Sequence, residues 1–118
     1  MSSAFDPSSK RLKAVTRLVR ILEAGLERGD FHGHTSAAHQ LVEATTRLLD
    51  ELRHDPAIDV ELTAALQVYR NAAFAFRRLA VASEEKNTAI ASACATLIEQ
   101  GNDHFQRFIL GSGRGHQK

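Results

Sequence analysis

Cysteine, tryptophan and proline are scarce in this sequence of 118 residues, and each shortage narrows the range of structures. Cys94 is the only cysteine, so the chain has no internal disulfide and we expect it in a reducing cytoplasm. Only two prolines interrupt the sequence, which leaves long stretches able to form helices. No apolar run approaches the roughly 20 residues that span a bilayer, so we expect no membrane partner.

Net charge is small as well, because 15 basic residues face 14 acidic ones and leave a balance of +1. The chain as a whole therefore has little attraction for nucleic acid or for membrane surfaces. Arginine outnumbers lysine by 11 to 4, which is typical of GC-rich bacterial genomes. Residues 1–22 are basic and nearly free of acidic residues, as transit peptides are, but they also carry an apolar stripe and we assign them to the fold.

Helical periodicity is what the sequence has in abundance. A chain of this length forms one domain with a core of its own, and its 18 alanines favour closely packed helices. The most regular stretch is residues 55–83, where apolar positions recur at alternating steps of four and three, as one face of a helix requires. This stripe consists of Ile58, Leu62, Ala65, Tyr69, Ala72, Phe76, Leu79 and Ser83.

Three further stretches show the same period, so we predict four helices, over residues 7–28, 36–53, 56–83 and 88–110. Residues 1–5 are expected to be disordered and residues 111–118 to form a flexible tail. Asp6-Pro7 and Asp55-Pro56 each start a helix, with the aspartate as N-cap and the proline at the first helical position. The sequence predicts an all-α fold, an antiparallel up-down-up-down four-helix bundle that could pair into a dimer.

The boundary between the third and fourth helices is the least defined, because residues 83–88 contain neither glycine nor proline. Either Ser83 or Thr88 could cap the fourth helix, and one long kinked helix through this region is the alternative. The expected buried face of the fourth helix contains Ile90, Ala93, Leu97, Gly101, His104 and Phe108.

His104 is the candidate ligand-binding residue, since it lies in the middle of that apolar face. A turn near residue 86 would bring it level with Tyr69 and, across the bundle, with Thr45. The imidazole, phenol and hydroxyl could then bind a small polar ligand, with Gly101 leaving room one turn away. The alternative is a core histidine whose hydrogen bonds are satisfied by Tyr69 or by a backbone carbonyl.

A second group of polar residues resembles a loose set of metal ligands: His32, His34, His39 and Glu43. His39 and Glu43 are four residues apart on one helix face and could reach one ion. The acidic residues lie on outward faces, however, so we predict neither a metal site nor any other cofactor.

Ala38-His39-Gln40-Leu41 resembles the histidine motif of histidine-containing phosphotransfer domains, which are also four-helix bundles of about this length. In that family the phosphoacceptor belongs to an His-x-x-Lys-Gly pattern. The resemblance implies a surface phosphoacceptor at His39, and the pattern departs at Val42 and Glu43, where a carboxylate would repel a phosphoryl group.

The first helix has a basic face made of Lys10, Lys13, Arg17 and Arg20. Such a face could contact phosphates through counterion release. No zinc ligand set, helix-turn-helix glycine or stacking aromatic accompanies it, so we do not expect nucleic acid as a partner. A solvated helix face is the alternative reading.

For catalysis the sequence offers no phosphate-cradling glycine loop, no nucleophile elbow and no paired carboxylates in an apolar setting, which favours a non-enzymatic protein. The third helix has more apolar surface than one bundle can bury, with Val60, Phe74 and Val81 facing water beside Arg78. We therefore predict an interaction module of regulatory or scaffolding type that pairs with itself or with another helical protein through this helix. The alternative is a small-ligand or phosphotransfer bundle that uses His104 or His39.

Overall fold

The computed structural model describes residues 9–54 and 59–116, with side chains up to residue 111. It has four α-helices: α1 (Lys10–Arg28), α2 (Thr35–Arg53), α3 (Val60–Leu79) and α4 (Glu84–His116). A short 3-10 helix, η1 (His32–His34), precedes α2. The described residues contain no strand, and the predicted four-helix bundle is confirmed.

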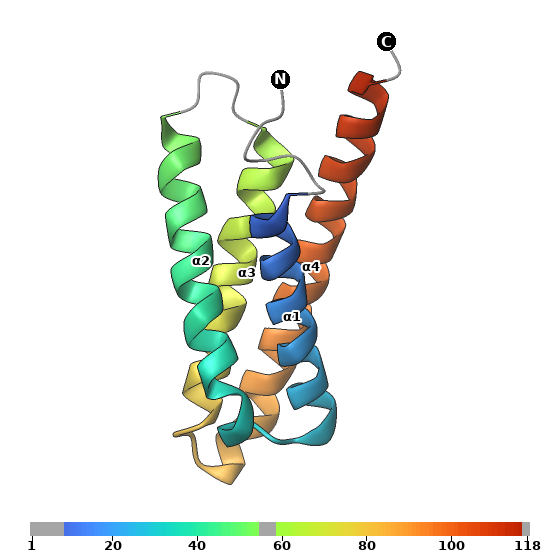
Figure 1. Ribbon diagram of the computed structural model, residues 1–118. Helices are drawn as coiled ribbons and strands as arrows, with labels where there is room; N and C mark the ends of the chain where they lie inside the picture. The colour runs from blue at the N-terminus through green and yellow to red at the C-terminus, as the bar shows by residue number, and fades with distance from the viewer. Residues whose placement is uncertain (1–8, 55–58, 117–118) are drawn as a thin grey trace.

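Consecutive helices run in opposite directions along the bundle, with α3 lying behind α1 and between α2 and α4 (Figure 1). α4 has 33 residues and is the longest element. At about 1.5 Å per residue it spans the length of the molecule, whose longest dimension is 52 Å. Its carboxyl-terminal end leans away from the other helices (Figure 1). In the described part of the chain, no helix is both long and apolar enough to cross a membrane.

Two of the helices begin later than predicted, each after a capping side chain. The Ser9 hydroxyl accepts a hydrogen bond from the Leu12 N–H, and the Asp59 carboxylate accepts one from the Leu62 N–H. Ser9 and Asp59 have extended backbone angles, so the helices start at residues 10 and 60 instead of 7 and 56. A side-chain oxygen that satisfies a free N–H of the first turn fixes such a start. The predicted Asp-Pro caps lie outside the described residues.

The boundary between α3 and α4 also differs from the prediction. α3 ends at Leu79 and α4 begins at Glu84, directly after Ser83, so the two are separate helices and Thr88 lies inside α4. At its other end α4 continues to His116, where a tail from residue 111 was expected. No proline follows Pro56, so nothing in the sequence interrupts the hydrogen-bond ladder of the helix.

The core is formed by one stripe from each helix. The predicted stripe of α2 is confirmed, since Ala38, Leu41, Thr45, Leu48 and Leu52 are all buried. The buried stripe of α4 is rotated relative to the prediction and consists of Cys94, Ile98, Gly101, Phe105 and Phe108. Ala93 is exposed and His104 is only partly buried. The rotation moves the candidate histidine from the core to the edge of the α3–α4 contact.

Candidate functional site

His104 lies against Glu61 at the edge of the α3–α4 contact instead of against Tyr69. Its Nδ1 atom is 3.0 Å from Glu61 Oε2, and 31% of its side chain is exposed. The cause is the rotation of α4, which places His104 at the edge of the contact while Gly101, Asn102 and Phe105 face the Tyr69 ring.

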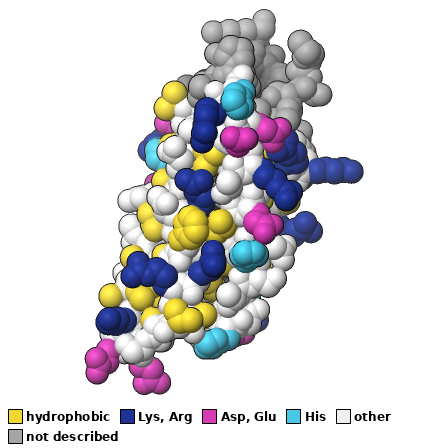
Figure 2. Space-filling model, turned by 90° about the vertical axis from the view of Figure 1, so that its left-hand side faces the viewer, with side chains coloured by type: hydrophobic (Ala, Val, Ile, Leu, Met, Phe, Trp, Pro, Cys, Tyr) yellow, Lys and Arg dark blue, Asp and Glu magenta, His cyan; other side chains and the backbone are white. Residues whose placement is uncertain are grey.

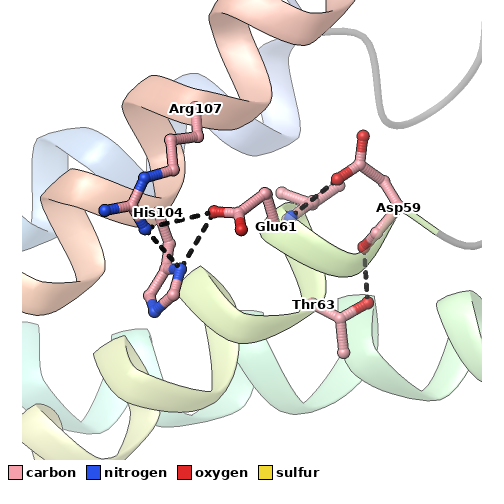
Figure 3. A network of polar contacts seen from close by, with 6 residues as sticks. Asp59, Glu61, Thr63, His104 and Arg107 are labelled. Carbon is pink, nitrogen blue, oxygen red and sulfur yellow. Dashed lines mark hydrogen bonds and ion pairs between the residues drawn. The ribbon is translucent and has the colours of Figure 1, made fainter.

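Figure 3 shows how Glu61, His104 and Arg107 form one polar cluster across the two helices. Arg107 Nη1 lies 3.6 Å from Glu61 Oε2 and 3.5 Å from His104 Nδ1. The shorter contact places the histidine proton on Nδ1, where it is donated to the carboxylate. The hydrogen bond from His104 holds the pKa of Glu61 below its usual value, and both neighbouring cations favour the ionised form. The cluster therefore connects the first turn of α3 with the carboxyl-terminal half of α4.

Thr45, Tyr69 and His104 do not converge on one pocket. Thr45 is fully buried, and its hydroxyl donates to the carbonyl of Leu41 at 2.7 Å within its own helix. The Tyr69 hydroxyl donates to Asn102 Oδ1 at 2.6 Å. Each of the three candidate residues is satisfied by a different partner, so the predicted ligand site is not assembled.

Tyr69 instead forms the floor of a groove between α1 and α4. α1 contributes Thr16, Arg20 and Glu23 to one wall, and α4 contributes Asn102, Gln106 and Ile109 to the other. Val19 and Phe105 lie with Tyr69 at the base, and the groove has a volume of about 470 Å³. Burial raises the pKa of the Tyr69 phenol, and the charge of Glu23 adds to this effect, so the hydroxyl stays protonated.

Sequence reasoning missed Asn102, Glu23 and Glu61, because each depends on the rotation of α4 or on the position of a turn. A usable signal existed for Asn102. Asparagine is a poor helix former. Asn102 directly follows Gly101, which belongs to a second apolar stripe that runs from Cys94 through Phe105. That stripe competes with the predicted one from Ile90 to His104.

The residues of the loose metal-ligand set do not come together, and only His39 and Glu43 contact each other. His34 Nδ1 is 2.8 Å from the backbone carbonyl oxygen of Asp30, and His39 Nε2 is 3.2 Å from Glu43 Oε1. His32 is exposed. Within the described ranges, no three histidine, cysteine or acidic residues are arranged to hold a metal ion. The carboxylate of Glu43 lies beside His39, so a phosphoryl group on His39 would be repelled by its negative charge.

The basic face of α1 is exposed along its whole length at Lys10, Lys13, Arg17 and Arg20. None of the four forms an ion pair with another described residue. Arg11 lies beside them and is paired with Glu51 of α2, which ties α1 to its neighbour.

The outer face of α3 exposes the apolar residues that the sequence singled out. Phe74 is 43% exposed, Val81 86% and Val60 74%. Phe74 is in the last two turns of α3 and Val81 lies two residues beyond its end, whereas Val60 is fourteen residues from Phe74, about 21 Å along the helix. Val60 thus lies outside the surface shared by the other two.

Charges of opposite sign flank Val81 symmetrically in the sequence. Arg77 and Arg78 lie four and three residues before it, and Glu84 and Glu85 lie three and four residues after it. All four are exposed. Figure 2 faces the left side of Figure 1 and shows acidic side chains at the lower tip, with Lys or Arg and small hydrophobic groups above them. The turn between α3 and α4 thus carries an exposed apolar residue with basic residues before it and acidic residues after it.

Comparison of the chain with protein-family models, with curated proteins and with solved structures finds no match in any of the three. The functional conclusions therefore rest on the geometry of the described residues.

Proposed function

We propose that this protein is a non-enzymatic helical interaction module, of regulatory or scaffolding type, that forms a homodimer through the outer face of α3. The observation that carries the proposal is the exposure of Phe74 on α3, whose other large apolar residues are mostly buried, and of Val81 in the turn that follows α3. Fully burying one such side chain is worth roughly 1.5–3 kcal/mol, which gives a second bundle a reason to cover this surface.

The order of charges around Val81 supports a second copy of the chain as the occupant. In a two-fold contact the same patch is used by both partners, so a residue before the axis meets a residue after it. With the axis near Val81, Arg77 and Arg78 of one chain face Glu84 and Glu85 of the other. Any other helical protein would need to supply this complementary pattern separately.

The test is the solution mass of the native chain and of the variant Phe74→Asp, measured by light scattering over a range of concentrations. We expect a dimer for the native chain. Because about half of each Phe74 is exposed and a dimer contains two of them, the substitution should cost about 2 kcal/mol, or roughly 30-fold in dissociation constant.

Leu110→Asp is the matched control, because Leu110 is also exposed but lies on α4, away from the outer face of α3. This variant should keep the native mass. A monomeric native chain at all concentrations would contradict the proposal, as would equal effects of the two aspartate substitutions. A heterodimer with another helical protein would then be the remaining form of the interaction.

A further inference from the structure

The proposed dimer surface does not include the groove between α1 and α4. The volume of this groove is that of a small-molecule site. Its volume of about 470 Å³ falls in the range of roughly 300–1,000 Å³ that such sites occupy. It runs for two helical turns on each wall, about 10 Å, which suits a compact molecule better than a docked helix.

The base of the groove is apolar and its rim is polar. Val19 and Phe105 form the base together with the Tyr69 ring, and Ile109 extends the apolar surface up the wall of α4. Asn102 Oδ1 already accepts the Tyr69 hydroxyl, so the amide nitrogen of Asn102 is the group left to donate. A ligand with an apolar body and a polar end matches this division.

The charges on the rim restrict that polar end further. Arg20 and Glu23 are three residues apart on the wall of α1, where side chains are neighbours, and both line the groove. Neither forms an ion pair among the described residues. A simple anion in the groove would be repelled by Glu23 and a simple cation by Arg20, whereas a molecule with both charges satisfies both residues.

We propose that the α1–α4 groove binds a small zwitterion with an apolar body, of the class of the apolar α-amino acids. Arg20 and the amide nitrogen of Asn102 bind the carboxylate, Glu23 binds the ammonium group, and Val19, Phe105 and Ile109 contact the apolar side chain. This site is independent of self-association through α3.

The experiment is a titration of the isotope-labelled native chain with L-phenylalanine, followed by backbone amide NMR shifts. Two matched probes each lack one charge: 3-phenylpropanoate has no ammonium group and 2-phenylethylamine has no carboxylate. We expect saturable shifts in residues 16–23 and 102–109 with L-phenylalanine, and binding about tenfold weaker or more for either probe. No saturable shift in these segments, or equal binding of a one-charge probe, would overturn the proposal.

Two tryptophan variants test the location. Gln106→Trp fills the groove and should abolish the shifts, whereas Gln100→Trp places the same ring on an exposed part of α4 outside the groove and should leave them unchanged. If circular dichroism shows that Gln106→Trp is unfolded, Ile109→Trp provides the same block. Binding that survives the block would place the ligand elsewhere and contradict the proposal. Phe74→Asp should bind L-phenylalanine as the native chain does, which separates this site from the dimer.

Discussion

The ring of Tyr69 in α3 packs directly against the backbone of Gly101 in α4. A Cβ atom on residue 101 would lie only 2.5 Å from Tyr69 Cε1, so the buried Tyr69 ring would have to shift to admit it. Gly101→Ala gains about 1 kcal/mol of helix propensity and loses about 1–3 kcal/mol to overpacking. We expect a net decrease in the free energy of unfolding of about 1 kcal/mol, measured by urea denaturation.

Gly111→Ala is the control for this prediction, because a Cβ at residue 111 has nothing within 4 Å. The same exchange in the same helix should then be neutral or stabilising by up to about 1 kcal/mol. Stabilisation by both substitutions would show that the ring does not occupy the space beside Gly101.

Thr45 has a structural role in this bundle, and the variant Thr45→Val tests this role. The buried hydroxyl donates to the Leu41 and Val42 carbonyls, which also accept bonds of the helix backbone, so its removal leaves no acceptor unpaired. We expect the free energy of unfolding to change by less than about 1 kcal/mol. A large loss of stability would mean that the hydroxyl has a further partner in the core.

Burial along α2 and α3 could be predicted from the sequence, because each has one dominant apolar stripe. Leu62, Tyr69, Phe76 and Leu79 are buried as their spacing predicts. α4 could not be assigned in this way, since its small residues allow two stripes that cross at Gly101. Packing against α3 selects between them: the Tyr69 ring needs Gly101, and the Cys94 thiol donates to the Ala72 carbonyl at 3.3 Å.

The candidate sites were harder to predict because they depend on register. Two polar residues, Ser83 and Thr88, compete to start α4, and sequence alone does not decide between them. The rotation of α4 about its own axis then determines that His104 meets Glu61 while Asn102 and Phe105 meet Tyr69. The exposure of Phe74 needed no such choice, since the wheel of a single helix places this residue outside its own core, whereas Val81 is exposed in the turn after α3.

Glu61→Gln tests the polar cluster through its pH dependence. The pKa of the Glu61 carboxyl is lowered in the folded chain, first by the hydrogen bond from His104 and then by the charges of His104 and Arg107. Its contribution to stability is therefore present above the usual pKa of 4.5 and is lost as pH falls below that value. The difference in unfolding midpoint between the native and variant proteins should therefore be smaller at pH 3 than at pH 6. A difference that persists unchanged at pH 3 would contradict the pairing.

The buried thiol of Cys94 leads us to predict that the folded protein loses stability at alkaline pH. Burial raises the pKa of its thiol from 9.0 to about 11, so the unfolded chain ionises first. The contribution of the protonated thiol is complete below pH 9 and falls as pH rises towards 11, by roughly 2–3 kcal/mol in all. Urea unfolding of the native chain and of Cys94→Ala at pH 8 and pH 11 measures it. Parallel losses in both proteins would show that the thiol is accessible to solvent.

The homodimer is the central claim, and its most direct test is a charge-swap cycle at the end of the bundle. One variant carries Arg77→Glu and Arg78→Glu, a second carries Glu84→Arg and Glu85→Arg, and a third carries all four changes. Each pair alone places like charges opposite one another in a two-fold contact, whereas the full set restores opposite charges in reversed order. Circular dichroism checks folding, because the arginines at the start of α4 oppose the helix dipole.

The measurement is the mass of all four proteins by light scattering at one concentration and low salt, where the native chain is dimeric. We predict monomers for the two paired variants and a dimer for the variant with all four changes. Loss of the dimer in the fourfold variant, or a dimer in all four proteins, would contradict self-association around Val81.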